Sequence, residues 1–166
     1  ICHCEKGIIN LSIKSASHSP LIKNFASGTV SNAVPAKADV NRLQEGEYLQ
    51  LAENAKAAEV EITVTRTEDG AKLLAKGKAS HAAAPQQGKN AAAYMVKLLA
   101  ETFGSDRLGE FFQFVYEKIG LTTDGSLLGV NISDEPSGPL TFNLGLLSCG
   151  AQGSSLTVDI RYPATK

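Results

Sequence analysis

A segment near the middle of the chain places one histidine among residues that suit the end of a strand. Residues 77–90 read Gly-Lys-Ala-Ser-His-Ala-Ala-Ala-Pro-Gln-Gln-Gly-Lys-Asn, so His81 closes a strand-like run and a helix-like run begins after Asn90. Side chains at such tips reach ligands more readily than side chains packed in a core. An imidazole there can donate a hydrogen bond to an oxyanion that develops during a reaction. The alternative is an exposed loop histidine without a chemical role.

Two more polar residues, Asn32 and Arg161, have side chains that bind carbonyls or anions. Arg161 lies on the polar side of a strand-like run, alternating with Ile160. A guanidinium in that position can grip a carboxylate through two parallel hydrogen bonds. Asn32 can donate its side-chain amide. The alternatives are an ion pair between Arg161 and Asp159 and a turn role for Asn32.

A complete catalytic metal site is not visible in the sequence. A hydrolytic zinc site needs three protein ligands, or a bridging carboxylate, and an open position for water. The chain has three histidines but no His-x-Asp, no Glu-Glu pair and no metal-binding helix motif. Cys2-His3-Cys4 would need ligands from elsewhere, and Cys149 suits a small buried apolar position. Phosphate-binding glycine loops and nucleophile elbows are also missing.

The overall composition restricts the class of protein. The 166 residues carry 16 basic and 17 acidic side chains, a balance that argues against a nucleic-acid partner. No apolar run approaches the roughly 20 residues of a membrane helix, and no signal-peptide pattern is present. Three cysteines do not form a disulfide framework, so we expect a reducing, cytoplasmic location. The start at Ile1 and the end at Lys166 suggest a domain excised from a longer protein.

Hydrophobic periodicity predicts the elements that must position these side chains. Alternation predicts strands over residues 9–13, 60–64, 140–146 and 156–160. Residues 71–80 are predicted to be the second strand of a hairpin, and residues 121–138 a loop-rich stretch with a strand at 127–132. Thr29 to Val40 is extended but interrupted by Pro35, so we expect an edge strand or two short strands around a bend. Asp69-Gly70 predicts a tight hairpin turn.

Apolar residues at helical spacing predict three helices. The first begins near Glu45 and buries Tyr48, Leu51, Ala52 and Ala55. The second spans residues 92–103. The third follows a predicted cap at residues 105–106 and carries a long apolar stripe from Leu108 to Ile119.

Strands in antiparallel pairs with helices between them indicate an α+β fold with the helices on one face of the sheet. The β–α–β–β–α order from Val30 to Phe103 resembles a ferredoxin-like sandwich. The terminal hairpin, residues 140–160, would extend that sheet.

Several segments together resemble the lid domain of dipeptidase V-type zinc metallopeptidases, relatives of aminoacylase, carboxypeptidase G and carnosinase. The resemblance covers nearly the whole chain in the right order. Its most specific part is Gly-Lys-x-x-His-x-x-x-Pro, and its segments are residues 5–8, 27–38, 77–91, 138–145 and 156–163.

The resemblance implies roles for the three polar residues. His81 would close over two zinc ions and stabilise the tetrahedral oxyanion, Asn32 would assist there, and Arg161 would bind the carboxylate of a dipeptide. The resemblance places the zinc ligands and the general-base glutamate in a separate catalytic domain. Residues 1–166 would therefore be a lid that binds no catalytic zinc and is inactive alone.

The length of the segment implies the long form of the lid, which supplies its histidine within one chain. We therefore expect a monomeric enzyme whose partners are its own catalytic domain and a dipeptide, with no membrane or nucleic-acid partner. Two alternatives stay open: the lid of an N-acyl amino acid deacylase or carboxypeptidase, and a non-catalytic ferredoxin-like binding or oligomerisation module.

Overall fold

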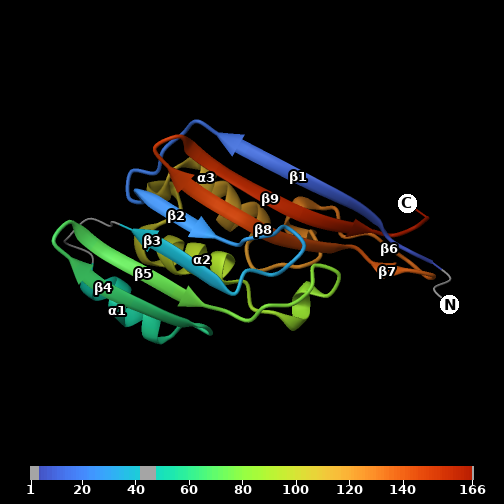
Figure 1. Cartoon of the computed structure of the whole chain (residues 1–166), viewed down its shortest axis with the longest axis horizontal. Coiled ribbons are helices and arrows are strands. Elements are labelled where there is room, and N and C mark those ends of the chain that lie inside the picture. The colour runs from blue at the N-terminus through green and yellow to red at the C-terminus, as the bar shows by residue number, and fades with distance from the viewer. Residues whose placement is uncertain (1–3, 42–47, 166) are drawn as a thin grey trace.

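The computed structural model describes residues 4–41 and 48–165. Seven strands form one antiparallel sheet in the order β1-β9-β8-β2-β3-β5-β4, and β6 and β7 form a separate ribbon (Figure 1). The strands are β1 (Gly7–Ser15), β2 (Asn24–Ser27), β3 (Lys37–Asn41), β4 (Glu61–Thr67), β5 (Gly70–Lys76), β6 (Ser133–Asp134), β7 (Gly138–Pro139), β8 (Thr141–Gly150) and β9 (Gly153–Tyr162).

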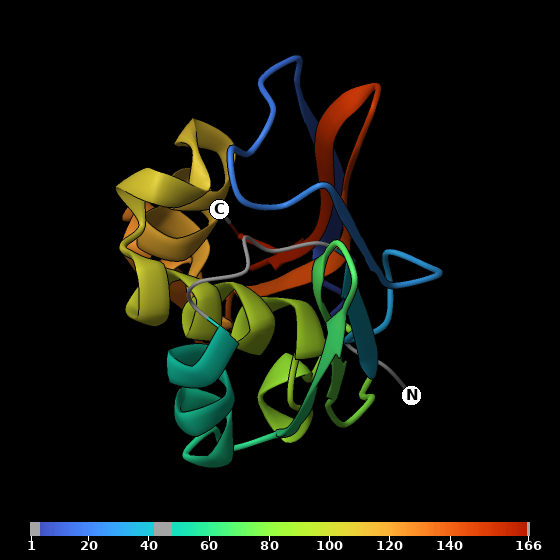
Figure 2. The same ribbon diagram turned by 90° about the vertical axis from the view of Figure 1, so that its left-hand side faces the viewer.

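All three α-helices lie on the same side of the sheet, as the view in Figure 2 shows. They are α1 (Tyr48–Lys56), α2 (Ala91–Phe103) and α3 (Glu110–Phe114), and α3 continues into a π-helical turn, η4 (Val115–Ile119). The described residues also include the short 3-10 turns η2 (Pro85–Gln87), η3 (Asp106–Leu108) and η5 (Ser126–Leu128). The predicted α+β fold with helices on one sheet face is confirmed. The ferredoxin-like description of its central part stays a prediction.

The core fills the space between the helices and the covered face of the sheet. Alternate residues of each strand point to opposite faces, so β8 and β9 give that core their apolar residues and keep polar residues for the other face. Phe25 of β2 packs against Phe112 of α3 with ring centroids 5.5 Å apart. The apolar spacing of α2 buries Met95 and Leu99 completely. The face of the sheet away from the helices is left available for a site.

The stretch from Thr29 to Val40 differs from its prediction. It contains one strand, β3, while β2 ends before it, and residues 28–36 form a loop. An edge strand is wrong here, because β2 and β3 are both interior strands. Pro35 lies outside the ladder, so it breaks no hydrogen bond between strands.

Local turn and cap chemistry accounts for the other differences. The pairing of Thr67 with Gly70 puts Glu68 and Asp69 at the centre of the hairpin turn, one residue earlier than predicted. Ser105 makes no side-chain cap. The predicted start of the first helix at Glu45 lies outside the described residues, and that helix is described from Tyr48.

Three predicted strands also differ from their predictions. Residues 127–132 form no strand; they include part of η5 instead. A register shift between Leu144 and Leu146 buries Leu147 and leaves Leu146 only partly buried. Strand β5 stops at Lys76, so His81 follows it on an irregular segment.

The described ends of the chain lie together at one end of the molecule (Figure 1). Strand β1 pairs with β9, and Gly7 stands opposite Tyr162. Asp134, in the ribbon beside them, accepts hydrogen bonds from the Ser137 hydroxyl at 2.6 Å and from the Thr165 backbone at 3.0 Å. The Ser137 hydroxyl is the main reason that the pKa of the Asp134 carboxyl lies well below its usual range.

Candidate functional site

Two loops that are far apart in the sequence carry His81 and Asn32 and pair with each other. His81 forms an isolated antiparallel bridge with Ala33. The Ala82 N–H donates to the Asn32 carbonyl at 3.0 Å, and the Val34 N–H donates to the Ser80 carbonyl at 2.8 Å. The structure therefore brings two of the three predicted site residues side by side.

The Asn32 loop lies against β8 on the sheet face away from the helices. Gly145 of β8 makes this approach possible, because a Cβ there would sit 2.3 Å from the Ser31 carbonyl oxygen. Asn143, two residues earlier, donates its amide Nδ2 to the carbonyls of Ser31 at 2.9 Å and Ala33 at 3.0 Å. Asn143 thus holds the backbone on both sides of Asn32.

The His81 loop is attached to the same strand, next to Arg161. The Thr141 hydroxyl of β8 donates to the Ala82 carbonyl at 3.1 Å. Thr141 pairs with Arg161 of β9, and residues paired across an antiparallel ladder project to the same face. His81, Asn32 and Arg161 therefore occupy one side of the sheet.

Arg161 is held by a buried carboxylate on its own strand. Its Nε lies 2.8 Å from Asp159 Oδ1, and its Nη2 lies 3.3 Å from Asp159 Oδ2. The Asp159 side chain is 2% exposed and the Arg161 side chain 16%. The ion pair with Asp159, one alternative reading of Arg161, therefore exists. It uses the Nε edge of the guanidinium, and the edge formed by Nη1 and Nη2 is the one left to meet a ligand carboxylate.

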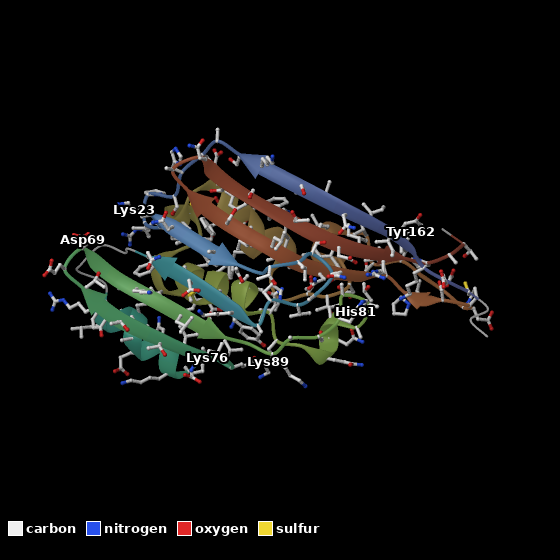
Figure 3. The ribbon with its side chains drawn as sticks, viewed as in Figure 1. Lys23, Asp69, Lys76, His81, Lys89 and Tyr162 are labelled. Atoms are coloured by element: carbon white, nitrogen blue, oxygen red, sulfur yellow. The ribbon has the colours of Figure 1, made fainter. Side chains whose placement is uncertain are left out.

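The imidazole of His81 is exposed, and one of its nitrogens is already used. Its Nδ1 accepts a hydrogen bond from the Ala83 N–H at 3.1 Å. In a neutral imidazole the proton must then be on Nε2, which leaves Nε2–H as a donor. Figure 3 shows His81 beyond the end of β5 that is opposite to the turn carrying Asp69.

Sequence reasoning missed the residues that support this site, Thr141 and Asn143. Both alternate with the buried Leu140, Phe142 and Leu144, so their polar type at strand spacing was a visible signal. Neither the partner loops nor their closeness to β8 can be read from that alternation.

A cavity of about 270 Å³ lies between the start of α2 and the end of η4. Tyr94, Thr123, Phe142 and Asn143 line it, whereas His81, Asn32 and Arg161 do not. Within residues 4–41 and 48–165, no three His, Cys, Asp or Glu side chains come together as a metal site. None of the described helices is long and apolar enough to cross a membrane.

Comparison with known proteins gives one informative similarity. No protein-family model matches the chain. The chain is 31% identical over 175 aligned positions to a Bacillus subtilis (strain 168) protein named "Putative dipeptidase YtjP". The alignment covers 99% of this chain but 38% of that protein, so the chain spans less than two-fifths of its relative's length.

Proposed function

We propose that this chain is the substrate-capping lid of a zinc-dependent dipeptidase. The observation that carries the proposal is the common face on which His81, Asn32 and Arg161 lie, with β8 linked to both loops. The similarity to a segment of a protein named as a dipeptidase supports the same class.

In this proposal the lid acts on the substrate through three groups. The Nε2–H of His81 donates to the oxyanion that forms when the peptide carbonyl is attacked. The Asn32 side-chain amide donates at the same place. Arg161 binds the C-terminal carboxylate of the dipeptide through its Nη1–Nη2 edge, while Asp159 fixes the plane of the guanidinium.

The described residues do not provide a zinc site, so no step of this mechanism passes through a metal in this chain. The zinc ions belong to the proposed catalytic domain. The resulting expectation is that the chain alone does not hydrolyse dipeptides.

The test is dipeptide hydrolysis by the complete enzyme that contains this chain, with His81→Ala compared against His18→Ala. His18 is an exposed histidine in the loop after β1, so it is a matched control. Removal of one oxyanion donor lowers turnover by about 10²–10³-fold, and we expect a change of this size in kcat with a small change in KM. Near-normal kcat for His81→Ala would remove the mechanism.

The carboxylate role of Arg161 is tested in the same assay with Arg161→Ala on dipeptides and their C-terminal amides. A hydrogen bond to a charged group contributes about 1.5–3 kcal/mol, so KM for the free acids should rise roughly 10- to 100-fold. The amides should be little affected, and equal losses on both would contradict a carboxylate clamp. Activity on N-acyl amino acids in place of dipeptides would indicate the deacylase alternative.

A further inference from the structure

Strand β8 carries two polar residues that the proposed chemistry does not use. Thr141 is 6% exposed and Asn143 is 1% exposed, and both lie on the sheet face away from the helices. Buried polar groups lower stability unless hydrogen bonds compensate for the loss of water. A position of this kind inside a sheet would ordinarily suit an apolar β-branched residue, so two buried polar residues in one row call for an explanation.

The side-chain hydrogen bonds of Thr141 and Asn143 go to the two loops of the site and to no other element that the structure describes. Asn143 Nδ2 bonds the carbonyls on either side of Asn32, at 2.9 and 3.0 Å. The Thr141 hydroxyl donates to the carbonyl of Ala82, the residue after His81, at 3.1 Å. Each loop is also bonded to the other through the Ala82 N–H and the Asn32 carbonyl.

The same two residues fix the loops relative to the arginine. Thr141 pairs with Arg161 across the ladder, and Asn143 pairs with Asp159. One row of β8 therefore stands between the Asp159–Arg161 pair on one side and the His81 and Asn32 loops on the other. Asn143 Oδ1 has no hydrogen-bond partner in the described part of the chain, and its burial is a cost that the two bonds from Nδ2 must offset.

We infer that Thr141 and Asn143 are positioning residues that set the distance between the oxyanion-binding loops and the carboxylate-binding arginine. The inference rests on the proposed function for its catalytic consequence. Its structural part, that these two side chains hold the loops on β8, stands on the hydrogen bonds alone. Displacement of a catalytic group by about 1 Å can lower the rate by roughly 10²-fold, so a loosened loop should have a measurable effect on turnover.

The first experiment compares Thr141→Val with Thr141→Ser in the complete enzyme. Valine keeps the shape of threonine and removes the hydroxyl, whereas serine keeps the hydroxyl. We expect kcat to fall about 10-fold in Thr141→Val, with serine within about twofold of the original enzyme. Ser148→Ala is the control, because the Ser148 hydroxyl lies on the same strand but bonds Ser155 at 2.8 Å. A loss that serine does not rescue would overturn the role of the hydroxyl.

The second experiment measures hydrogen exchange and needs no activity. The Ala82 and Val34 N–H groups form the bonds between the two loops. In Thr141→Val and in Asn143→Asp we expect their exchange to accelerate about 10-fold or more, while the amides of β9 keep their protection. Unchanged exchange at Ala82 and Val34 in both variants would overturn the inference.

The two experiments separate the failure of this inference from the failure of the proposed function. If His81→Ala keeps full activity and Thr141→Val exchanges its loop amides faster, the proposed function is wrong and the positioning role is supported. If His81→Ala loses activity and both β8 variants leave loop exchange unchanged, the positioning role is wrong and the proposed function is supported.

Discussion

The two halves of the candidate site are held in different ways. Arg161 and Asp159 are two residues apart on one strand, flanked by β1 and β8, and their side chains are mostly buried. His81 and Asn32 are exposed residues on irregular loops, held through their backbones by each other and by β8. The first half depends on strand alternation and one ion pair, and the second depends on contacts between distant segments.

The difference shows how rigidity and access are divided in this site. A buried carboxylate and guanidinium bonded through two atoms have little freedom, which suits recognition of a carboxylate of fixed geometry. Exposed donors on loops can approach a ligand, and their backbones stay in place because each loop carbonyl near them has a partner. Substitutions in the two halves are therefore expected to have different consequences.

The largest effect is expected for Asp159→Ala. This change leaves the Arg161 guanidinium, whose side chain is 16% exposed, without its carboxylate partner. Removal of one partner from a buried ion pair costs about 3–5 kcal/mol, and we expect about 3 because Arg161 keeps some access to water. The free energy of unfolding in urea measures the loss.

The matched control for Asp159→Ala is Glu61→Ala, which removes an exposed ion pair with Lys76 whose side chains are 63% and 56% exposed. Exposed pairs contribute about 0–1 kcal/mol. Similar losses in the two variants would contradict the view that burial makes the Asp159 pair important.

Compared with Asp159→Ala, Gly145→Ala is expected to lower the free energy of unfolding less and to displace the Asn32 loop more. The new Cβ would meet the Ser31 carbonyl oxygen at 2.3 Å and the Ser31 Cα at 2.6 Å, so the Asn32 loop must move away from β8. Overpacking of this kind costs about 1–3 kcal/mol. Faster hydrogen exchange at the Val34 N–H, together with urea unfolding, measures both consequences.

Gly150→Ala is the control for this loop, because it lies on the same strand and its new Cβ would meet nothing nearer than the Asn24 Oδ1 at 3.6 Å. We expect its stability to stay within about 0.5 kcal/mol of the original protein. If both alanines leave the loop unchanged, contact with β8 is not what holds it.

The smallest effect concerns Asp134, which lies outside both halves of the site. Hydrogen bonds from Ser137 and Thr165 hold the pKa of its carboxyl below the unfolded value of about 3.9. A lowered folded-state pKa gives stability that is present above the unfolded pKa and is lost as the pH falls below it. Asp134→Asn should therefore flatten the loss of thermal stability between about pH 4 and pH 2. An identical pH profile for the variant would contradict this role.

Much of the fold follows from local pattern, and the exceptions have physical causes. Alternation predicted β9 and the burial of Val158, and helical spacing predicted α2. Both patterns are visible in the sequence because each helical turn and each pair of strand residues places an apolar side chain in the core. The segment around Pro35 was placed on an edge because a proline cannot donate to a ladder. The chain avoids that conflict by leaving the ladder as a loop. Asn143 of β8, residues 80–82 and the Ala91 N–H at the start of α2, which donates to the Pro35 carbonyl at 2.9 Å, stabilise this loop.

The candidate site was also predictable in part, from local properties of the sequence, and in part not. The sequence alone determined that His81, Asn32 and Arg161 are polar residues at element ends or on a polar strand face, because residue type and alternation are local properties. Only the tertiary structure decided that they share one side of the sheet. That arrangement depends on Gly145, Thr141 and Asn143 meeting backbone carbonyls of remote loops, and such contacts between distant residues leave no periodic signal in the chain.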